Sequence, residues 1–385
     1  MSILTSHEQR TTEQVDHRLR IVFVISRGDE IGGAHIHVRD LSTALRSRGA
    51  EVTILAGRDG RFANHLRECG IPIHCIQNLH RSVGPFQAVK AVLEIRELLR
   101  QLRPDIVSTH STTAGLLGRI AAYSLGIPAL FTAHGWGFTK GHPWIQRVIF
   151  WLVEWAAAPL ASRIITVCES DFSAAERSFL TRKDRLVAIP NAMPDVKESL
   201  RARPERSPPK IVMVARMAWQ KDHATLLRAL AQLTDLDWQL ELVGDGPLLS
   251  SVEGLAASLG IASRVRFAGY RQDVAERLAD GQIFVLASNW EGFPRSILEA
   301  MRAGLPVIAS DVGGVRESVR ESETGFVVPR GNIDVLRDRL RLLIAAPLYR
   351  RQMGEAGRAW YEKRFSLDRL VAETTAVYDS VLSDS

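Results

Sequence analysis

The sequence predicts an α/β protein of two successive doubly wound domains, each with a parallel sheet covered by helices on both faces. Short apolar runs, typical of buried strands, alternate with helical patterns along the chain. In the first half these runs are residues 20–26, 51–56, 106–108, 129–132 and 164–167. The alternation stops over residues 194–210, a charged stretch with four prolines that is predicted to be a linker. It resumes with residues 211–215, 240–243, 265–268, 283–287 and 307–309.

Composition and cysteine usage are typical of a globular protein in a reducing compartment. Of the 385 residues, 46% are apolar and 24% charged. Cys69, Cys75 and Cys168 form no Cys-x-x-Cys pair, so we expect no disulfide framework and a cytoplasmic location. Residues 1–19 are polar and lack the apolar core of a signal peptide, which predicts a disordered lead-in. No apolar run reaches membrane-spanning length.

The positive charge lies mainly in the first half of the chain. The net charge is +6, and residues 1–195 contain 23 Lys and Arg against 18 Asp and Glu, which gives +5. Such a domain could bind nucleic acid, anionic lipid or a phosphorylated substrate. A solvated arginine-rich surface is the alternative explanation of the charge. Because no zinc-finger, RNP or helix-turn-helix pattern accompanies the charge, we do not expect nucleic acid.

Two glutamates, Glu291 and Glu299, flank a predicted strand-to-helix turn. The turn consists of Gly292, Phe293 and Pro294. A helix is expected from Arg295 to the closing Gly304-Leu305-Pro306. The free N–H groups at its start would attract an anion, with one carboxylate before the turn and the other two helical turns later. This pattern suits an elongated ligand with a central phosphate and hydroxyls at both ends, such as a nucleotide sugar.

Arg216 and Lys221 follow the first strand of the second domain. Two cations at a strand end could hold a diphosphate through charge-assisted hydrogen bonds of about 1.5–3 kcal/mol each. Two solvated surface cations are the alternative. Gly269 and Tyr270 end a later strand and could lie along a nucleotide base, although a core or loop position for Tyr270 is equally consistent with the pattern.

Gly32 and Gly33 join the first strand to the first helix. Glycine permits positive φ and close backbone approach, so a phosphate or sugar could lie against this helix N-terminus. His134 follows a strand beside Gly135, and a neutral imidazole suits a sugar because it both donates and accepts hydrogen bonds. A structural histidine that caps the loop is the alternative. His110 also ends a strand and is an acceptor-side candidate.

No metal site is expected from these patterns. His35 and His37 are two residues apart on a helix, so their side chains diverge. Asp235 and Asp237 form an Asp-x-Asp pattern, but they precede a strand and are predicted to form a polar turn at the opposite edge of the sheet. Cations and helix N-termini can neutralise a diphosphate instead.

Residues 144–155 form one segment unusually rich in aromatic side chains. A largely buried helix of the first domain would explain this content. An exposed aromatic face that dips into a membrane interface would explain it as well.

The Glu-x7-Glu pattern, the Gly-Phe-Pro turn and residues 305–314, with Gly313-Gly314, together resemble the retaining glycosyltransferases of family 4. The resemblance extends from residue 20 to residue 382. It implies the GT-B fold, two Rossmann-like domains facing a central cleft. Residues 1–195 would then form the acceptor-side domain, 196–365 the nucleotide-sugar domain, and the terminal helix 366–385 would pack back on the first domain.

The resemblance also assigns roles to individual residues. Arg216 and Lys221 would bind the donor phosphates, the diglycine loop would face the donor across the cleft, and His134 would contact the transferred sugar. Two positions depart from the family pattern. Asp222 follows Lys221 where many relatives have glycine. Ala192 replaces the glycine of a Pro-Asn-Gly hinge, so either Ala192 tolerates that backbone geometry or Asn191 adopts the left-handed conformation itself.

The expected activity is metal-independent, retaining transfer of a hexose-type sugar from a nucleoside diphosphate, UDP rather than GDP. The acceptor would be a hydroxyl of a lipid-linked saccharide in bacterial surface polysaccharide assembly, reached at the inner face of an anionic membrane. Glu291 would hold the sugar hydroxyls and Glu299 the ribose. A sugar-nucleotide epimerase of the same fold and a non-catalytic nucleotide-sugar-binding partner of another transferase are the alternatives. The presence of Glu291, Glu299, Arg216 and Lys221 together argues against both.

Overall fold

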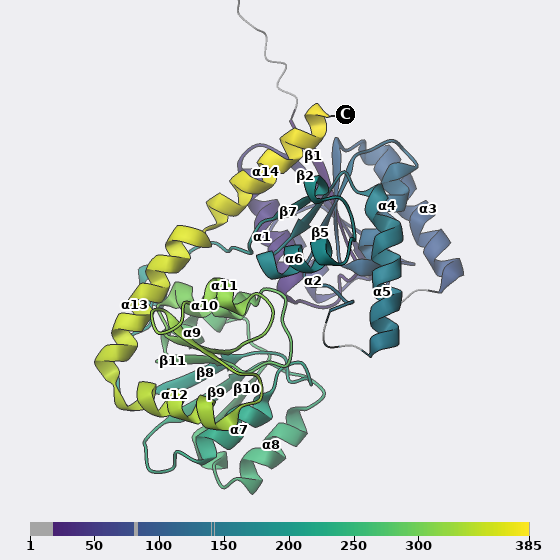
Figure 1. Cartoon of the computed structure of the whole chain (residues 1–385). Coiled ribbons are helices and arrows are strands. Elements are labelled where there is room, and N and C mark those ends of the chain that lie inside the picture. The colour runs from purple at the N-terminus through teal and green to yellow at the C-terminus, as the bar shows by residue number, and fades with distance from the viewer. Residues whose placement is uncertain (1–17, 81–83, 140, 142, 385) are drawn as a thin grey trace, which may run out of the picture.

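The computed structural model describes residues 18–80, 84–139, 141 and 143–384. These residues form two α/β domains, one above the other in Figure 1. Of the expected disordered lead-in, only Arg18 and Leu19 fall within the described residues, and Leu19 packs on the core of the first domain.

The first domain contains a sheet of seven parallel strands in the order β3-β2-β1-β4-β5-β6-β7. Its strands are β1 Arg20–Ile25, β2 Glu51–Gly57, β3 Ile73–Ile76, β4 Ile106–His110, β5 Ala129–Ala133, β6 Arg163–Thr166 and β7 Leu186–Ala188. Its helices are α1 Gly33–Ser47, α2 Arg61–Glu68, α3 Pro85–Leu102, α4 Thr112–Tyr123, α5 Trp144–Ala157 and α6 Glu169–Arg177. Phe23 and Ile25 of β1 point into one apolar cluster, whereas Val22 and Val24 point into another, so helices bury both faces of the sheet.

The second domain repeats this plan with six parallel strands in the order β10-β9-β8-β11-β12-β13. The strands are β8 Lys210–Val214, β9 Gln239–Val243, β10 Val265–Gly269, β11 Ile283–Leu286, β12 Val307–Ser310 and β13 Gly325–Val328. The helices are α7 His223–Ala231, α8 Leu249–Ser258, α9 Val274–Ala279, α10 Arg295–Ala303, α11 Val315–Ser318, α12 Ile333–Ala345 and α13 Pro347–Arg364. The short 3-10 helices are η1 Ala158–Leu160 and η2 Lys183–Arg185 in the first domain, and η3 Glu198–Leu200 and η4 Ala262–Arg264 after it. Helix α10 ends where predicted, because Gly304 adopts φ +83°.

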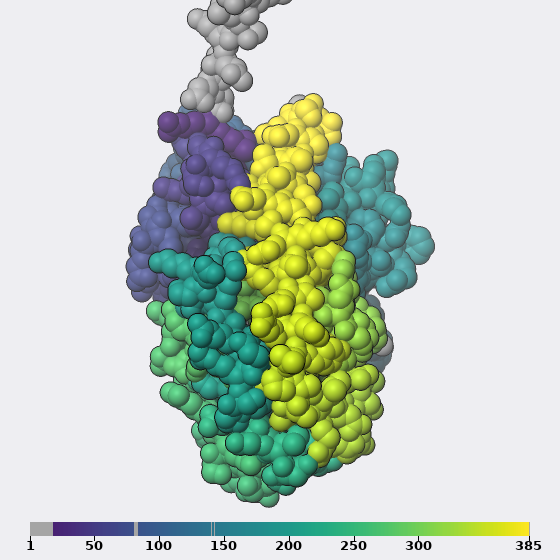
Figure 2. All heavy atoms as spheres, turned by 90° about the vertical axis from the view of Figure 1, so that its left-hand side faces the viewer, coloured from purple at the N-terminus to yellow at the C-terminus, as the bar shows by residue number. Residues whose placement is uncertain are grey.

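The last helix, α14 (Leu367–Ser383), returns to the first domain, and α13 and α14 form one band over both domains (Figures 1 and 2). Leu370, Val371, Val377 and Tyr378 belong to the apolar cluster beneath α1. The connection between the domains is held by Arg350 of α13, whose buried guanidinium donates to the carbonyls of Pro204 and Arg206.

Helix α5 is attached to the first domain along only one narrow side. Glu154 and Ala157 are its buried residues. Its exposed apolar side chains are Trp144, Ile145, Val148, Ile149, Leu152 and Trp155. The interpretation of this segment as a largely buried helix is therefore wrong. No helix within the described residues is long and apolar enough to cross a membrane.

A buried ion pair attaches α5 to α4. The guanidinium of Arg119 donates to a carboxylate oxygen of Glu154 at 3.0 Å and to the carbonyls of Gly115 and Ala157 at 2.7 and 3.2 Å. It also lies 4.3 Å from the centre of the Phe131 ring. Arg119 is fully buried, so Glu154 supplies its compensating charge.

We predict that Glu154→Ala lowers the free energy of unfolding of the first domain by about 3–5 kcal/mol, because Arg119 keeps a buried, unpaired charge. Urea unfolding followed by circular dichroism measures this loss. The control, Glu355→Ala, breaks the exposed ion pair with Arg351 on α13 and should leave the transition unchanged. Equal midpoints for the two variants would contradict the anchoring role of Glu154.

Candidate active site

Two strand-end loops of the second sheet lie side by side because β8 and β11 are neighbours. The loop after β8 carries Arg216 and Lys221, and the loop after β11 carries Glu291. Their main chains are joined, since the N–H of Asp222 donates to the Ala287 carbonyl at 3.0 Å. Strand order therefore places predicted donor-binding residues from separate parts of the sequence at one edge of the sheet.

Lys221 and Glu291 form an ion pair at this edge. The Lys221 ammonium donates to Oε1 of Glu291, and the two side chains are only 15% and 6% exposed. Ser288 Oγ donates to the same oxygen at 2.6 Å, and Gln220 Nε2 lies 3.5 Å from Oε2. Three side chains thus fix the orientation of the Glu291 carboxylate.

Arg216 is an exposed cation in the same loop as Lys221, and it has no ion pair with any residue that the structure describes. Asp222, where many family-4 sequences have glycine, caps α7. It has φ −82°, and its carboxylate accepts the N–H of Thr225 at 3.2 Å. This position therefore needs no glycine, and the departure leaves the loop intact.

The turn before α10 contributes its main chain, while its one large side chain lies in the core. Phe293 is buried against Phe365, with ring centres 5.7 Å apart. Any donor contact from Phe293 must therefore come from its backbone. Glu299, on the second turn of α10, is half-buried and accepts no hydrogen bond from the described residues. Burial raises the pKa of the Glu299 carboxyl, and Arg295 and Arg302 oppose this rise.

Gly313 allows the Glu291 loop to take this shape. It has φ +54°, and a Cβ at this position would lie 2.1 Å from the carbonyl oxygen of Glu291. A side chain here would have to displace the backbone of the residue that binds Lys221. Gly314 completes the contact, because its N–H donates to the Gly292 carbonyl at 2.7 Å.

His134 and Gly135 of the first domain face this turn from across the cleft. A Cβ on Gly292 would lie 2.9 Å from the His134 carbonyl, so the two loops are in direct contact. His134 Nε2 lies 3.0 Å from Nδ1 of His110. Burial holds the pKa of both imidazoles well below the usual histidine value, so both rings are neutral near pH 7.

The diglycine loop faces the second domain, but its two glycines do not adopt the positive φ that glycine permits. Gly32 is extended, with φ −144°, and Gly33 has no positive φ either, so the positive-φ interpretation was wrong. The N–H of Gly32 donates to His35 Nδ1 at 3.2 Å. A Cβ on Gly33 would lie 3.6 Å from the Cδ of Arg295, which places this loop against the start of α10.

Gly269 and Tyr270 also lie at the cleft. Gly269 has φ +66°, and its carbonyl accepts the N–H of Gly244 at 2.8 Å. The Tyr270 side chain is 41% exposed, and the Arg61 guanidinium of the first domain lies 5.2 Å from its ring centre. Tyr270 therefore contacts the opposite domain and does not lie in the core.

The predicted Asp-x-Asp turn is remote from these loops. The Asp235 carboxylate makes two hydrogen bonds to Arg341 of α12, at 2.6 and 3.0 Å. It precedes β9, at the edge of the sheet opposite to Arg216. His35 and His37 diverge as expected, because His35 Nε2 lies 3.0 Å from the Arg27 carbonyl whereas His37 Nδ1 lies 3.1 Å from Asn191 Oδ1.

Arg295 and Asn191 join the two domains at the site, and sequence patterns did not indicate either contact. Arg295 Nη2 donates to Asp40 Oδ2 at 2.6 Å, and Nη1 donates to the Ala192 carbonyl at 2.8 Å. Asn191 Nδ2 donates to the Phe293 carbonyl at 3.3 Å. Neither Asn191 nor Ala192 has a positive φ. The backbone of this hinge therefore accommodates alanine at position 192 without a left-handed conformation.

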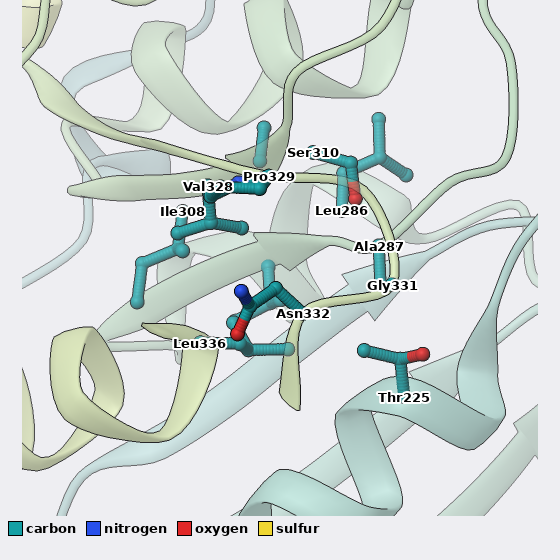
Figure 3. Close-up of a pocket in the computed structure, with 12 residues that line it drawn as sticks. Thr225, Leu286, Ala287, Ile308, Ser310, Val328, Pro329, Gly331, Asn332 and Leu336 are labelled. Atoms are coloured by element: carbon teal, nitrogen blue, oxygen red, sulfur yellow. The ribbon is translucent and has the colours of Figure 1, made fainter. Parts of the chain in front are cut away.

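A separate crevice, too narrow to hold a water molecule, lies within the second domain between β11–β13 and helices α7 and α12 (Figure 3). Its walls include Thr225, Leu286, Ser310, Asn332 and Leu336, and they contain no charged residue. It could not neutralise a diphosphate, and we therefore place the candidate active site at the cleft.

Comparison with known proteins identifies the class of this chain. Residues 32–192 match the family model described as "Glycosyl transferase 4-like domain", and residues 196–360 match "Glycosyl transferases group 1". The chain is 26% identical over 301 residues to the Escherichia coli UDP-Gal:alpha-D-GlcNAc-diphosphoundecaprenol alpha-1,3-galactosyltransferase, covering 74% of this chain and 77% of that protein. It is 27% identical over 354 residues to the putative glycosyltransferase EpsD of Bacillus subtilis, covering 88% and 91%.

The fold matches solved structures over nearly the whole chain. Anabaena Alr3699/HepE, in complex with UDP-glucose, superposes with a TM-score of 0.81 at 21% identity, covering 94% of this chain and 100% of that chain. The protein is thus a glycosyltransferase with the GT-B fold. It belongs to the family-4-like glycosyltransferases.

We predict that Gly313→Ala lowers the transfer rate by about a hundredfold, because the new Cβ displaces the backbone that positions Glu291. The rate is measured as release of nucleoside diphosphate from the sugar donor. The matched control is Gly260→Ala, at a glycine with φ +71° and no neighbour within 4 Å of an added Cβ. This control carries the same backbone strain without the contact, so equal activity in the two variants would show that the contact does not matter.

Proposed function

We propose that this enzyme transfers a hexose-type sugar from a UDP-sugar, with retention of anomeric configuration, to a hydroxyl of a lipid-linked saccharide in bacterial surface polysaccharide assembly. The E. coli relative, whose name specifies a UDP-galactose donor and a diphosphoundecaprenol-linked acceptor, supports this choice of donor and acceptor class. Retention rests on the resemblance to family 4.

The observation that carries the proposal is the charge arrangement at the ends of β8 and β11. Lys221 and Glu291 neutralise each other, and Arg216 adds an exposed positive charge from the same loop as Lys221. A diphosphate that approaches this edge meets Arg216 first and can then replace Glu291 as the partner of Lys221. Glu291 Oε1 becomes available to sugar hydroxyls at the moment when the phosphates take the two cations.

The remaining residues surround a donor in this position. Glu299 would accept hydrogen bonds from the ribose, and Gly269 and Tyr270 would lie along the uracil. The N–H groups that follow Gly292, Phe293 and Pro294 would face a phosphate from the start of α10. Across the cleft, His134 would contact the transferred sugar, and Gly32 and Gly33 would border the donor from the first domain.

In this mechanism the departing diphosphate takes the acceptor proton while the sugar passes through an oxocarbenium-like state. Arg216 and Lys221 would stabilise the charge that develops on the leaving group. We propose that turnover needs no metal ion, because these two cations and the α10 N-terminus supply the positive charge. Asp235 does not compete for this role, since it is held by Arg341 at the opposite edge of the sheet.

The exposed face of α5 supports a peripheral contact of the first domain with the membrane that carries the acceptor. Helices α3 and α5 both pack on α4 and lie on the side of the first domain away from α14 (Figure 1). On the same side of the domain, helix α3 exposes Phe86, Val89 and Leu93 together with the cations Lys90 and Arg96. Apolar rings flanked by cations suit the interface of an anionic bilayer.

A panel of nucleotide sugars with a lipid-linked saccharide acceptor tests the function. In buffer with EDTA we expect release of UDP from one UDP-hexose, and an α-linked product from an α-linked donor. If EDTA abolishes turnover and manganese restores it, the metal-independent mechanism is wrong.

In the same assay we predict that Arg216→Ala and Lys221→Ala each lower the rate by about a hundredfold or more, since the loss of a transition-state charge partner costs about 2.7–4 kcal/mol. Arg341→Ala is the matched control because it removes an arginine from the opposite edge of the same domain. Near-normal rates in folded Arg216 and Lys221 variants would rule out this site.

We predict that the protein co-sediments with anionic phosphatidylglycerol vesicles at low salt and that added salt weakens this binding, because the charge contribution is screened. Trp144→Ser with Trp155→Ser should lower the pelleted fraction by about tenfold, which corresponds to about 1.4 kcal/mol of lost apolar burial. Trp151 is left intact because its Nε1 donates to the Ser178 carbonyl.

The control for vesicle binding is Trp219→Ser. Trp219 is 72% exposed but belongs to the second domain, so its loss should not change pelleting. An equal loss in both variants, or no pelleting of the unaltered protein, would exclude α5 as the membrane-contacting face.

A further inference from the structure

Three histidines from separate elements converge at the carboxyl edge of the first sheet. His37 comes from α1, His110 ends β4, and His134 follows β5. One nitrogen from each ring lies within 4.8 Å of the other two. His110 Nδ1 and His134 Nε2 are 3.0 Å apart, and the ring of His37 stands edge-on to that of His134 with 4.9 Å between their centres.

The outward nitrogens of two of these rings are already held by oxygen atoms. His37 Nδ1 lies 3.1 Å from Asn191 Oδ1, and His110 Nε2 lies 3.2 Å from Ser108 Oγ. These contacts leave His37 Nε2 and His110 Nδ1 for the interior of the cluster, next to His134 Nε2. Histidines that bind metals are commonly fixed in this way, with the second nitrogen hydrogen-bonded to an oxygen.

The electrostatic surroundings also suit a cation bound by neutral imidazoles. Each neutral imidazole carries one N–H and one lone pair, and a metal ion would displace the proton that His110 Nδ1 and His134 Nε2 share in their hydrogen bond. Arg295 is a positively charged side chain that acts on both His37 and His134, and Asp40, which also pairs with Arg39, offsets part of this charge.

We propose that His37, His110 and His134 form a binding site for one divalent transition-metal ion of the zinc type. Three imidazoles without a carboxylate favour zinc, cobalt or nickel over magnesium or manganese. Tetrahedral zinc, with bonds of about 2.0–2.1 Å, needs ligand nitrogens about 3.3 Å apart, and the three nitrogens lie within 4.8 Å of one another. His134 is only half-buried, so the fourth position of the ion would open to the cleft.

This site would affect the enzyme through His134. If the proposed function is correct, the transferred sugar and the ion need the same imidazole, and they compete for it. The metal-free protein is then the active form, and zinc acts as an inhibitor.

Cobalt titration of the untagged, EDTA-treated full chain tests the site. Tetrahedrally bound cobalt absorbs visible light strongly, and we expect this band to saturate at one equivalent and to disappear when zinc is added. His37→Gln and His110→Gln should each abolish the band. Ser108→Ala, which removes only the partner of His110 Nε2, should weaken cobalt binding by about tenfold or more. The control His74→Gln changes an exposed histidine of β3 and should bind cobalt normally.

The proposal is overturned if no band forms, or if the folded His37 and His110 variants bind cobalt as the unaltered protein does. Turnover distinguishes this failure from that of the proposed function. We expect one equivalent of zinc to lower the rate of the EDTA-treated enzyme by at least about tenfold. Zinc could also bind the three histidines and leave the rate unchanged. In that case the sugar does not contact His134, and the proposed donor position is wrong while the metal site stands.

Discussion

The buried ion pair between Arg295 and Asp40 determines how the two domains meet. Arg295 is the first residue of α10, and Asp40 lies within α1 of the other domain. Both side chains are less than 10% exposed, and the guanidinium also holds the Ala192 carbonyl in the connection between the domains. Removal of Asp40 would leave Arg295 as a buried, unpaired charge at a cost of about 3–5 kcal/mol, whereas Asp40 also pairs with Arg39 and would keep a partner if Arg295 were removed. Opening of the cleft costs less, because water can hydrate both groups as they separate.

The turn that contacts the first domain lies directly before Arg295, at the start of α10. The turn before α10 touches the His134 loop so closely that Gly292 has no room for a side chain. The same two helices are joined a second time through the end of the chain, since α13 packs on α10 and α14 packs on α1. The ion pair and this band connect α10 to α1 at two places, and Glu299 of α10 lies close enough to Asp40 and Arg39 of the first domain to feel their charges.

Sequence patterns predicted the central strands and the strand-end residues, but not how distant residues pair. Central strands are buried on both faces, so their sequences stand out as apolar runs. The edge strands β3, β7 and β13 were not predicted from the sequence. β3 is four residues long and exposes His74, so its pattern is mixed. Lys221 and Glu291 were each predicted as donor-binding, but their ion pair depends on β8 and β11 being neighbours, which spacing along the chain does not reveal. The meeting of His37, His110 and His134 and the contact between Arg295 and Asp40 likewise depend on sheet order and domain orientation.

The pairing of Lys221 with Glu291 explains how the site could hold a charged donor without a large desolvation cost. A half-buried lysine without a partner would be unfavourable, and so would a buried carboxylate. In the proposed reaction, a phosphate oxygen replaces the carboxylate at Lys221, so the ammonium exchanges one anionic partner for another. Glu291 does not lose all its contacts, because Ser288 still donates to it and Gln220 lies nearby. The polar groups that bind the sugar are therefore oriented before the donor arrives, and little reorganisation remains for the step in which charge moves to the leaving group.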